Sequence, residues 1–147
     1  MPIQITSSAF KDGETIPAQY TCDGANVSPP LAWSGVPGGT HSLAVIADDP
    51  DAPVGTWVHW VLYNLPVGQT SLVEGVQGVG LQGTNDFRKI GYGGPCPPRG
   101  KPHRYFFKLY ALDSTADLKP GGSKADLEKA MQGHILAQGQ LMGKYGR

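Results

Sequence analysis

Several features are scarce or missing in this chain of 147 residues, and each absence removes a class of protein. The formal net charge is zero, which argues against a general affinity for nucleic acid or for anionic membrane surfaces. No apolar run approaches the roughly 20 residues of a membrane span, and the N-terminus lacks the basic and apolar regions of a signal peptide. We therefore expect a soluble cytoplasmic protein that binds no nucleic acid and has no stable membrane insertion.

Cysteine is also scarce. Cys22 and Cys96 are too few for a disulfide framework and lack the close spacing of metal ligands, so we expect reduced, half-buried thiols. Tight metal motifs such as HExxH are absent, and no cofactor is expected. The length suits one domain, residues 1–147, that buries roughly two-thirds of its unfolded surface around a single core.

Glycine and proline, in contrast, are abundant. The 21 glycines and 13 prolines are scattered as turn punctuation, which suits an all-β chain with many corners. Strands are predicted over 42–47, which is buried, and over 57–64, which is apolar on both faces. A strand over 103–112 has one apolar face, made by Tyr105, Phe107, Leu109 and Ala111.

The remaining segments give weaker or more local signals. An edge strand is expected within 3–10, and Trp33 should enter the core from an extended segment. Ser123, with Asp126 three residues later, predicts the start of a helix that Gly133 stops. The tail from residue 138 to 145 suits either a strand or a helical turn. Residues 75–94 have little periodicity, and no element is predicted there.

Residues 48–53 have the sequence Asp-Asp-Pro-Asp-Ala-Pro. Three carboxylates in four residues repel one another and two prolines fix φ, so a stiff loop is predicted rather than a strand interior. In the strand that follows, the period of two places Trp57, His59, Val61 and Tyr63 on one face. His59 is therefore expected on rigid backbone close to the acidic loop.

A second proline-rich loop, residues 95–102, leads into His103. The surrounding residues 88–108 carry six basic side chains and no acid. If the two stiff loops meet, they form a mixed-charge pocket that could hold a phosphate beside an amine. His41 and His134 are interpreted as ordinary structural side chains.

At this point the sequence resembles a known family. Residues 49–53 with 57–59, and residues 94–105, resemble the two signature regions of the phosphatidylethanolamine-binding protein family, most closely its short bacterial branch, the Raf kinase inhibitor-like proteins. The likeness implies a mainly β fold, an antiparallel Greek-key β-sandwich with one or two short helices. It also implies an anion pocket, whose walls by position are Asp49, Asp51, Pro53, Trp57, His59, Gly94, Pro95, His103 and Tyr105.

What the resemblance implies about function is binding without catalysis. The expected ligand is a phosphate-like anion or a phosphorylated small molecule or head group. The chain could then regulate or inhibit a kinase or protease, although no protein partner is identified. Cys96 between Pro95 and Pro97 departs from the eukaryotic pattern, so the pocket rim should differ. We expect the acidic loop to raise the pKa values of His59 and His103.

Other readings stay open. One alternative is a metal-dependent enzyme that uses His59, His103 and Asp49 as a two-histidine, one-carboxylate site. Another is a hydrolase with Cys96 near His103, although the flanking prolines give no reason for an activated thiolate. The resemblance also leaves open a Cys22–Cys96 disulfide under oxidising conditions and a homodimer.

Overall fold

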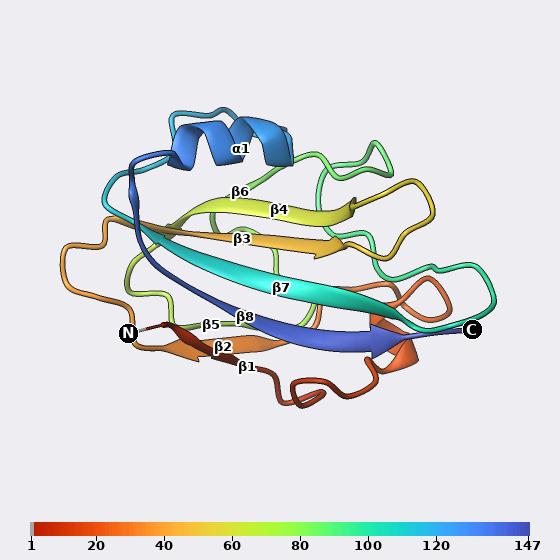
Figure 1. Ribbon diagram of the computed structural model, residues 1–147. Coiled ribbons are helices and arrows are strands. Elements are labelled where there is room, and N and C mark those ends of the chain that lie inside the picture. Colours follow the sequence, from red (N-terminus) through yellow and green to blue (C-terminus); the bar gives the residue numbers. More distant parts are fainter. Residues whose placement is uncertain (1) are drawn as a thin grey trace.

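The structure, a computed structural model, describes residues 2–147 and arranges them in two antiparallel sheets (Figure 1). The smaller sheet has the order β1-β2-β5 and the larger sheet the order β6-β4-β3-β7-β8. The expected mainly β sandwich with short helices is therefore confirmed. The elements are β1 (Gln4–Thr6), the 3-10 turn η1 (Ala18–Tyr20), β2 (Leu31–Ser34), β3 (Ser42–Asp49), β4 (Trp57–Pro66), β5 (Ser71–Leu72), β6 (Leu81–Gln82), β7 (His103–Leu112), α1 (Lys124–Met131) and β8 (Ile135–Tyr145).

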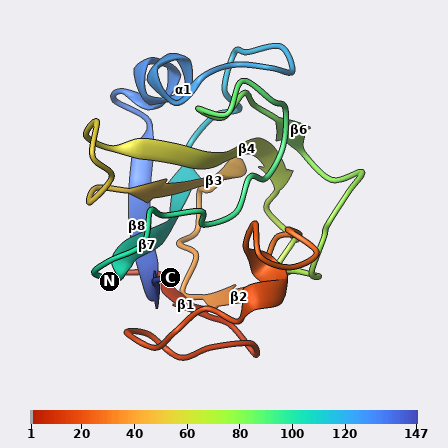
Figure 2. The same ribbon diagram turned by 90° about the vertical axis from the view of Figure 1, so that its right-hand side faces the viewer.

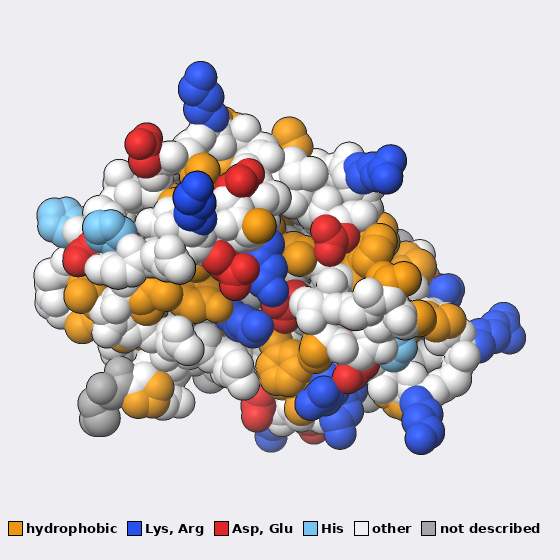
Figure 3. Space-filling view, turned by 45° about the horizontal axis from the view of Figure 1, so that its top comes forward, with side chains coloured by type: hydrophobic (Ala, Val, Ile, Leu, Met, Phe, Trp, Pro, Cys, Tyr) orange, Lys and Arg blue, Asp and Glu red, His pale blue; other side chains and the backbone are white. Residues whose placement is uncertain are grey.

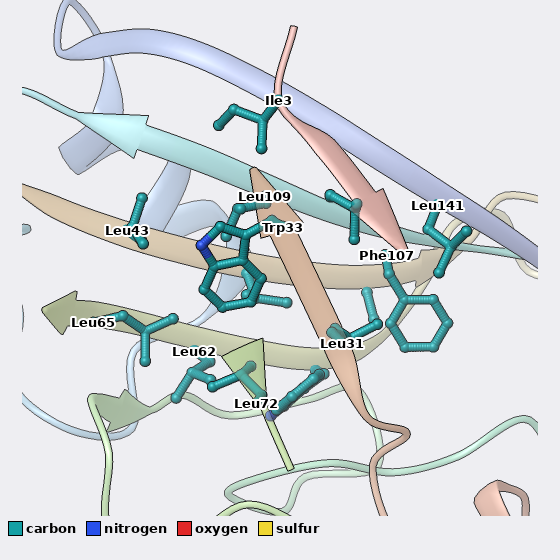
Figure 4. Packing of buried hydrophobic residues seen from close by; sticks show 14 of the residues in the cluster. Ile3, Leu31, Trp33, Leu43, Leu62, Leu65, Leu72, Phe107, Leu109 and Leu141 are labelled. Atoms are coloured by element: carbon teal, nitrogen blue, oxygen red, sulfur yellow. The ribbon is translucent and has the colours of Figure 1, made fainter. Parts of the chain in front are cut away.

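The main core lies between the two sheets. Trp33 of β2 packs against side chains of the larger sheet, among them Leu43, Leu65 and Leu109, as Figure 4 shows. Trp33 is only 7% exposed, so the prediction that it enters the core is confirmed. On β7 the alternation is also as predicted, because Tyr105, Phe107, Leu109 and Ala111 are all buried in this core.

A second core covers the opposite face of the larger sheet. Figure 2 shows α1 on the side of β3 and β4 away from β1 and β2. Leu127 and Met131 of the helix pack there against side chains that include Val61 and Tyr63. Because helix and small sheet each cover one face, β4 is apolar on both sides, as its sequence predicts.

The helix has the predicted boundaries. The Ser123 side chain accepts from the Asp126 N–H and the Asp126 carboxylate accepts from the Ser123 N–H, which satisfies two free donors at the helix start. The helix ends at Met131, two residues before Gly133, which has φ +79°. None of the helices in residues 2–147 is long and apolar enough to cross a membrane.

One open alternative is settled and one expectation needs adjustment. The tail forms a strand, β8, which pairs with β7 along its whole length. The predicted acidic loop is shorter than expected, because Asp48 and Asp49 are the last residues of β3 and pair with Val58 and Trp57 of β4. Both carboxylates are tolerated in a buried strand because each is bound by cationic or N–H groups. Asp48 accepts from Nζ of Lys108 and from Nζ of Lys124, and the partners of Asp49 are described below.

Candidate functional site

Three strand ends meet at one end of the sandwich, on the right in Figure 1. β3 ends at Asp49, while β4 begins at Trp57 and β7 begins at His103. Asp48 is paired with Val58 on one side and with Phe106 on the other, so the antiparallel register places these ends side by side. The two proline-containing loops that lead into β4 and β7 therefore lie against each other.

A β-bulge sets the direction of His59. Ala47 pairs with Trp60 and Asp48 with Val58, so His59 is the extra residue on β4. The bulge breaks the strict alternation, and the prediction that Trp57, His59, Val61 and Tyr63 share one face is wrong. Val61 lies in the core beneath α1, whereas the His59 ring packs edge-on against Tyr105, with 5.2 Å between ring centroids.

The His59 ring is buried and held in one tautomer. Its Nδ1–H donates to the Gly93 carbonyl oxygen over 2.7 Å. Every fully buried side-chain nitrogen and oxygen among residues 2–147 has a hydrogen-bond partner, and Nε2 of His59 has none, so Nε2 is open to the cavity that the ring lines. Burial lowers the pKa of His59, since desolvation outweighs the Gly93 carbonyl and Asp49. The expectation of a raised pKa is therefore wrong for His59.

His103 is fixed by a different acceptor. Its Nδ1–H donates to Oδ2 of Asp49 over 2.7 Å, and the two side chains are 12% and 4% exposed. The other oxygen of Asp49 accepts from the Asp51 N–H over 2.7 Å. Asp49 thus orients the imidazole and also holds the first turn of the loop after β3. The His103 ring lies nearly parallel to that of Tyr105.

These side chains line a cavity of about 220 Å³. Six of the nine predicted site residues lie on its walls: Asp49, Pro53, Trp57, His59, His103 and Tyr105. Tyr105 is 2% exposed and its hydroxyl has no hydrogen-bond partner in residues 2–147, so the hydroxyl also opens to the cavity. Burial, reinforced by Asp49, raises the pKa of Tyr105, and the hydroxyl remains a donor.

Three predicted site residues lie outside the cavity lining. The Asp51 carboxylate is bound by Nε and Nη2 of Arg104, both over 2.9 Å, and this contact lowers its pKa to about 2. Gly94 and Pro95 are buried but do not line the cavity. A Cβ at Gly94 would lie 2.3 Å from the Tyr20 carbonyl oxygen, so only glycine fits that close approach. The Pro95 carbonyl accepts from the Cys22 N–H.

The sequence analysis missed part of the lining, namely Ala52, Val54, Phe87, Cys96, Pro97 and Pro98. Phe87 is the most consequential omission, because its ring packs edge-on against both Trp57 and His59. Its position depends on Asn85, whose buried amide oxygen accepts from the Phe87 and Lys89 N–H groups. The sequence signal that could have pointed to Phe87 was an aromatic residue two positions after an asparagine, within a glycine-rich stretch.

The structure forms a disulfide between Cys22 and Cys96, which are separated by 74 positions. The expectation of two reduced thiols is therefore wrong. The bond ties the turn after η1 to the loop that lines the cavity. Because Cys96 has no free thiol here, the hydrolase reading loses its nucleophile.

The three residues of the metal-enzyme alternative lie close together, but each is hydrogen-bonded to another of them or to the backbone. Asp49 accepts from His103 and from the Asp51 backbone, and His59 donates to Gly93. No group of three or more His, Cys, Asp or Glu side chains within residues 2–147 is arranged to hold a metal ion. The two-histidine, one-carboxylate ligand set of this alternative is thus not formed by these side chains.

Comparison with known proteins gives one consistent result. The family model described as phosphatidylethanolamine-binding protein matches residues 6–146. A UPF0098 protein of Methanothermobacter thermautotrophicus is 52% identical, with 99% of each chain covered, and one of Aquifex aeolicus is 50% identical, with 99% of this chain and 89% of that protein covered. The similarity therefore extends to archaeal as well as bacterial proteins.

Solved structures agree. A phosphatidylethanolamine-binding protein homologue from Chlamydia trachomatis superposes with a TM-score of 0.95 at 44% identity, covering 99% of this chain and 98% of that one. YbcL of E. coli, described as a new member of the mammalian family, superposes with a TM-score of 0.92 at 36% identity, covering 100% of this chain and 99% of that one. Proteins of this family are generally binding proteins, which indicates a binding or regulatory role. The chain belongs to the phosphatidylethanolamine-binding protein family.

Proposed function

We propose that the cavity binds a small phosphate-like anion, free or as the phosphate group of a small molecule, and that the chain acts by binding rather than by catalysis. The observation that carries the proposal is that two imidazoles, His59 and His103, line one cavity with the Tyr105 hydroxyl. Each ring has its Nδ1–H already engaged, so its Nε2 is left for a ligand.

The three groups have different hydrogen-bonding roles. His59 has a lowered pKa and stays neutral, so its Nε2 is an acceptor. His103 has the Asp49 carboxylate as a counter-charge, and in its protonated form Nε2–H is a charge-assisted donor. The Tyr105 hydroxyl is a second donor. With His103 protonated, the cavity offers two donors and one acceptor to the same small ligand.

This combination suits an oxyanion that still carries a proton. A singly protonated phosphate can donate its P–OH to Nε2 of His59 while its other oxygens accept from His103 and Tyr105. Sulfate has no proton at neutral pH and would face the His59 lone pair with another acceptor. We therefore propose that inorganic phosphate is preferred over sulfate, and that a phosphate monoester binds in its singly protonated form, which is populated below its second pKa of about 6.

The rim suits the part of a ligand that lies beyond its phosphate. Val54 is 80% exposed and Phe87 36% exposed, and both border the cavity with Pro53 and Pro98. Such a rim can contact the carbon atoms of a head group, or of a phosphorylated segment of a partner protein that the chain would regulate. The proline-rich loops reduce the ordering cost of binding a ligand this small.

Isothermal titration calorimetry with inorganic phosphate, phosphoethanolamine and sulfate tests the proposal. Phosphate and phosphoethanolamine should bind, and sulfate should bind more weakly. His103→Ala removes a charge-assisted hydrogen bond, which is worth about 1.5–3 kcal/mol, and should weaken phosphate binding roughly tenfold to a hundredfold.

His134→Ala is the matched control, because His134 also pairs with an aspartate but lies away from the cavity. It should leave phosphate affinity unchanged. The proposal is wrong if wild-type protein gives no binding heat up to millimolar phosphate, or if both histidine variants behave alike.

A further inference from the structure

A second hollow adjoins the cavity. Its walls come from the loop before β7, the first residues of β7 and the end of β8, and it shares Pro98 and His103 with the cavity. Its basic side chains are Arg99, Lys101, Arg104 and Lys144, and its one acid is Asp51. Figure 3 shows blue Lys and Arg side chains gathered at the right-hand end of the molecule, close to a pale-blue histidine.

The charges of this basic cleft are not balanced. Arg104 occupies both carboxylate oxygens of Asp51, at 2.9 Å each. Arg99, Lys101 and Lys144 have no carboxylate within 4.0 Å among the residues described. Since the whole chain has a formal net charge of zero, three uncompensated cations in one hollow are a local concentration that attracts anions.

The backbone keeps these cations together. Lys144 of β8 is directly opposite Arg104 of β7, and like charges at opposed positions repel unless an anion intervenes. Arg147 ties down the loop that carries Arg99 and Lys101, because its Nε donates to the Pro97 carbonyl and its own carbonyl accepts from the Gly100 N–H. These two bonds hold the loop that carries Arg99 and Lys101 against the chain just after β8, the strand that carries Lys144.

We infer that the basic cleft is a second anion subsite, and that the preferred ligand is a small molecule with two phosphate groups. One phosphate occupies the cavity against His103 and the other contacts Arg99, Lys101 and Lys144. The inference rests on the proposed function, since it assumes that the first phosphate is held in the cavity. Linking two phosphates makes the second contact intramolecular, which raises affinity without any change at the first site.

Calorimetry with alkanediol bisphosphates of increasing chain length, each compared with its monophosphate, tests the inference. At the best chain length the bisphosphate should bind at least about tenfold more tightly than the monophosphate. In the Arg99→Ala/Lys101→Ala variant this gain should disappear, while monophosphate affinity stays the same. Both side chains are exposed, so the fold is not at risk.

Lys129→Ala, on the exposed side of α1, is the matched control and should keep the full gain. Equal affinities for bisphosphate and monophosphate in the wild type, or a gain that survives in Arg99→Ala/Lys101→Ala, would overturn the inference and leave the proposed function standing. Failure of both ligands to bind would overturn the proposed function and the inference with it. His103→Ala should weaken both ligands, and unchanged bisphosphate binding in that variant would overturn the inference that one of the two phosphates occupies the cavity.

Discussion

Two aspartate–histidine pairs lie at the opposite ends of β7, and their hydrogen bonds have the same length. Nδ1 of His103 is 2.7 Å from an Asp49 oxygen, and Nδ1 of His134 is 2.7 Å from an Asp113 oxygen. Their surroundings differ. The side chains of the first pair are 12% and 4% exposed, whereas those of the second are 46% and 44% exposed.

The comparison teaches that the bond alone does not define a site. At the His134 end, water solvates both partners and competes with any ligand. At the His103 end, a disulfide, two proline-rich loops and the rings of His59 and Tyr105 enclose the free side of the imidazole. We therefore assign the binding role to the enclosed pair, and the following changes test that distinction.

The largest effect is expected from the covalent tie at the cavity end. The Cys22–Cys96 bond closes a loop of 74 positions, so Cys22→Ser/Cys96→Ser should lower the free energy of unfolding by about 4 kcal/mol. Urea unfolding of both proteins, with and without reductant, measures this. Reductant should destabilise only the wild type. Equal midpoints for both proteins in oxidising buffer would contradict the structural role of the bond.

The second effect should distinguish Asp49 of the enclosed pair from Asp113 of the exposed pair. Asn at position 49 would turn an N–H group toward either His103 or the Asp51 N–H, each of which needs an acceptor. Asp49→Asn should therefore cost about 1–3 kcal/mol and also weaken phosphate binding. Asp113→Asn, in the exposed pair, should cost less than about 1 kcal/mol and leave binding unchanged. Similar losses in the two variants, measured by denaturant unfolding, would erase the distinction.

The third effect is a pH dependence that comes from the buried ring at the cavity end. The pKa of His59 is lowered in the folded protein, so the unfolded chain binds the extra proton first as pH falls. The contribution of neutral His59 to the free energy of unfolding is fully present above the pKa of the unfolded chain, about 6.5. It is lost as pH falls below that pKa, by at most about 1.4 kcal/mol per pH unit. Stability measured by denaturant unfolding between about pH 7 and 5 should fall less steeply in His59→Gln than in the wild type.

The smallest effect is expected at the Asp51–Arg104 contact, which borders the cavity from outside. Arg104→Ala should raise the pKa of Asp51 from about 2 toward its ordinary value of 3.8, because the guanidinium is the main cause of the shift. The stability that Asp51 contributes is present above that ordinary pKa and is lost as pH falls toward 2. Carboxyl titration by NMR should show the shift, with little change in stability because the pair is partly exposed.

The elements with strong periodic or capping signals were predictable from the sequence. The apolar row of β7 and the capping box at Ser123 appear where their patterns place them. The face of β4 on which the His59 side chain lies was not predictable. A one-residue bulge reverses the alternation of side chains between the two faces, and that bulge depends on how β4 pairs with β3. Local sequence carries no information about that register.

The residues of the cavity also divide into those that were predictable from the sequence and those that were not. The proline-rich loops and their histidines could be picked out along the chain, since each segment is distinctive by itself. Phe87 reaches the cavity only because Asn85 folds a glycine-rich segment back onto β4, and Asp51 is diverted from it by Arg104. The lowered pKa of His59 follows from burial, which a count of nearby acids does not reveal.

The most direct test of the central claim is an NMR titration of the four histidine rings with inorganic phosphate. If the enclosed pair and His59 form the anion site, the Nε2 and ring-proton signals of His59 and His103 shift with one common affinity, and those of His41 and His134 stay in place. Equal shifts at all four rings, or none at His59 and His103 up to millimolar phosphate, would contradict the account.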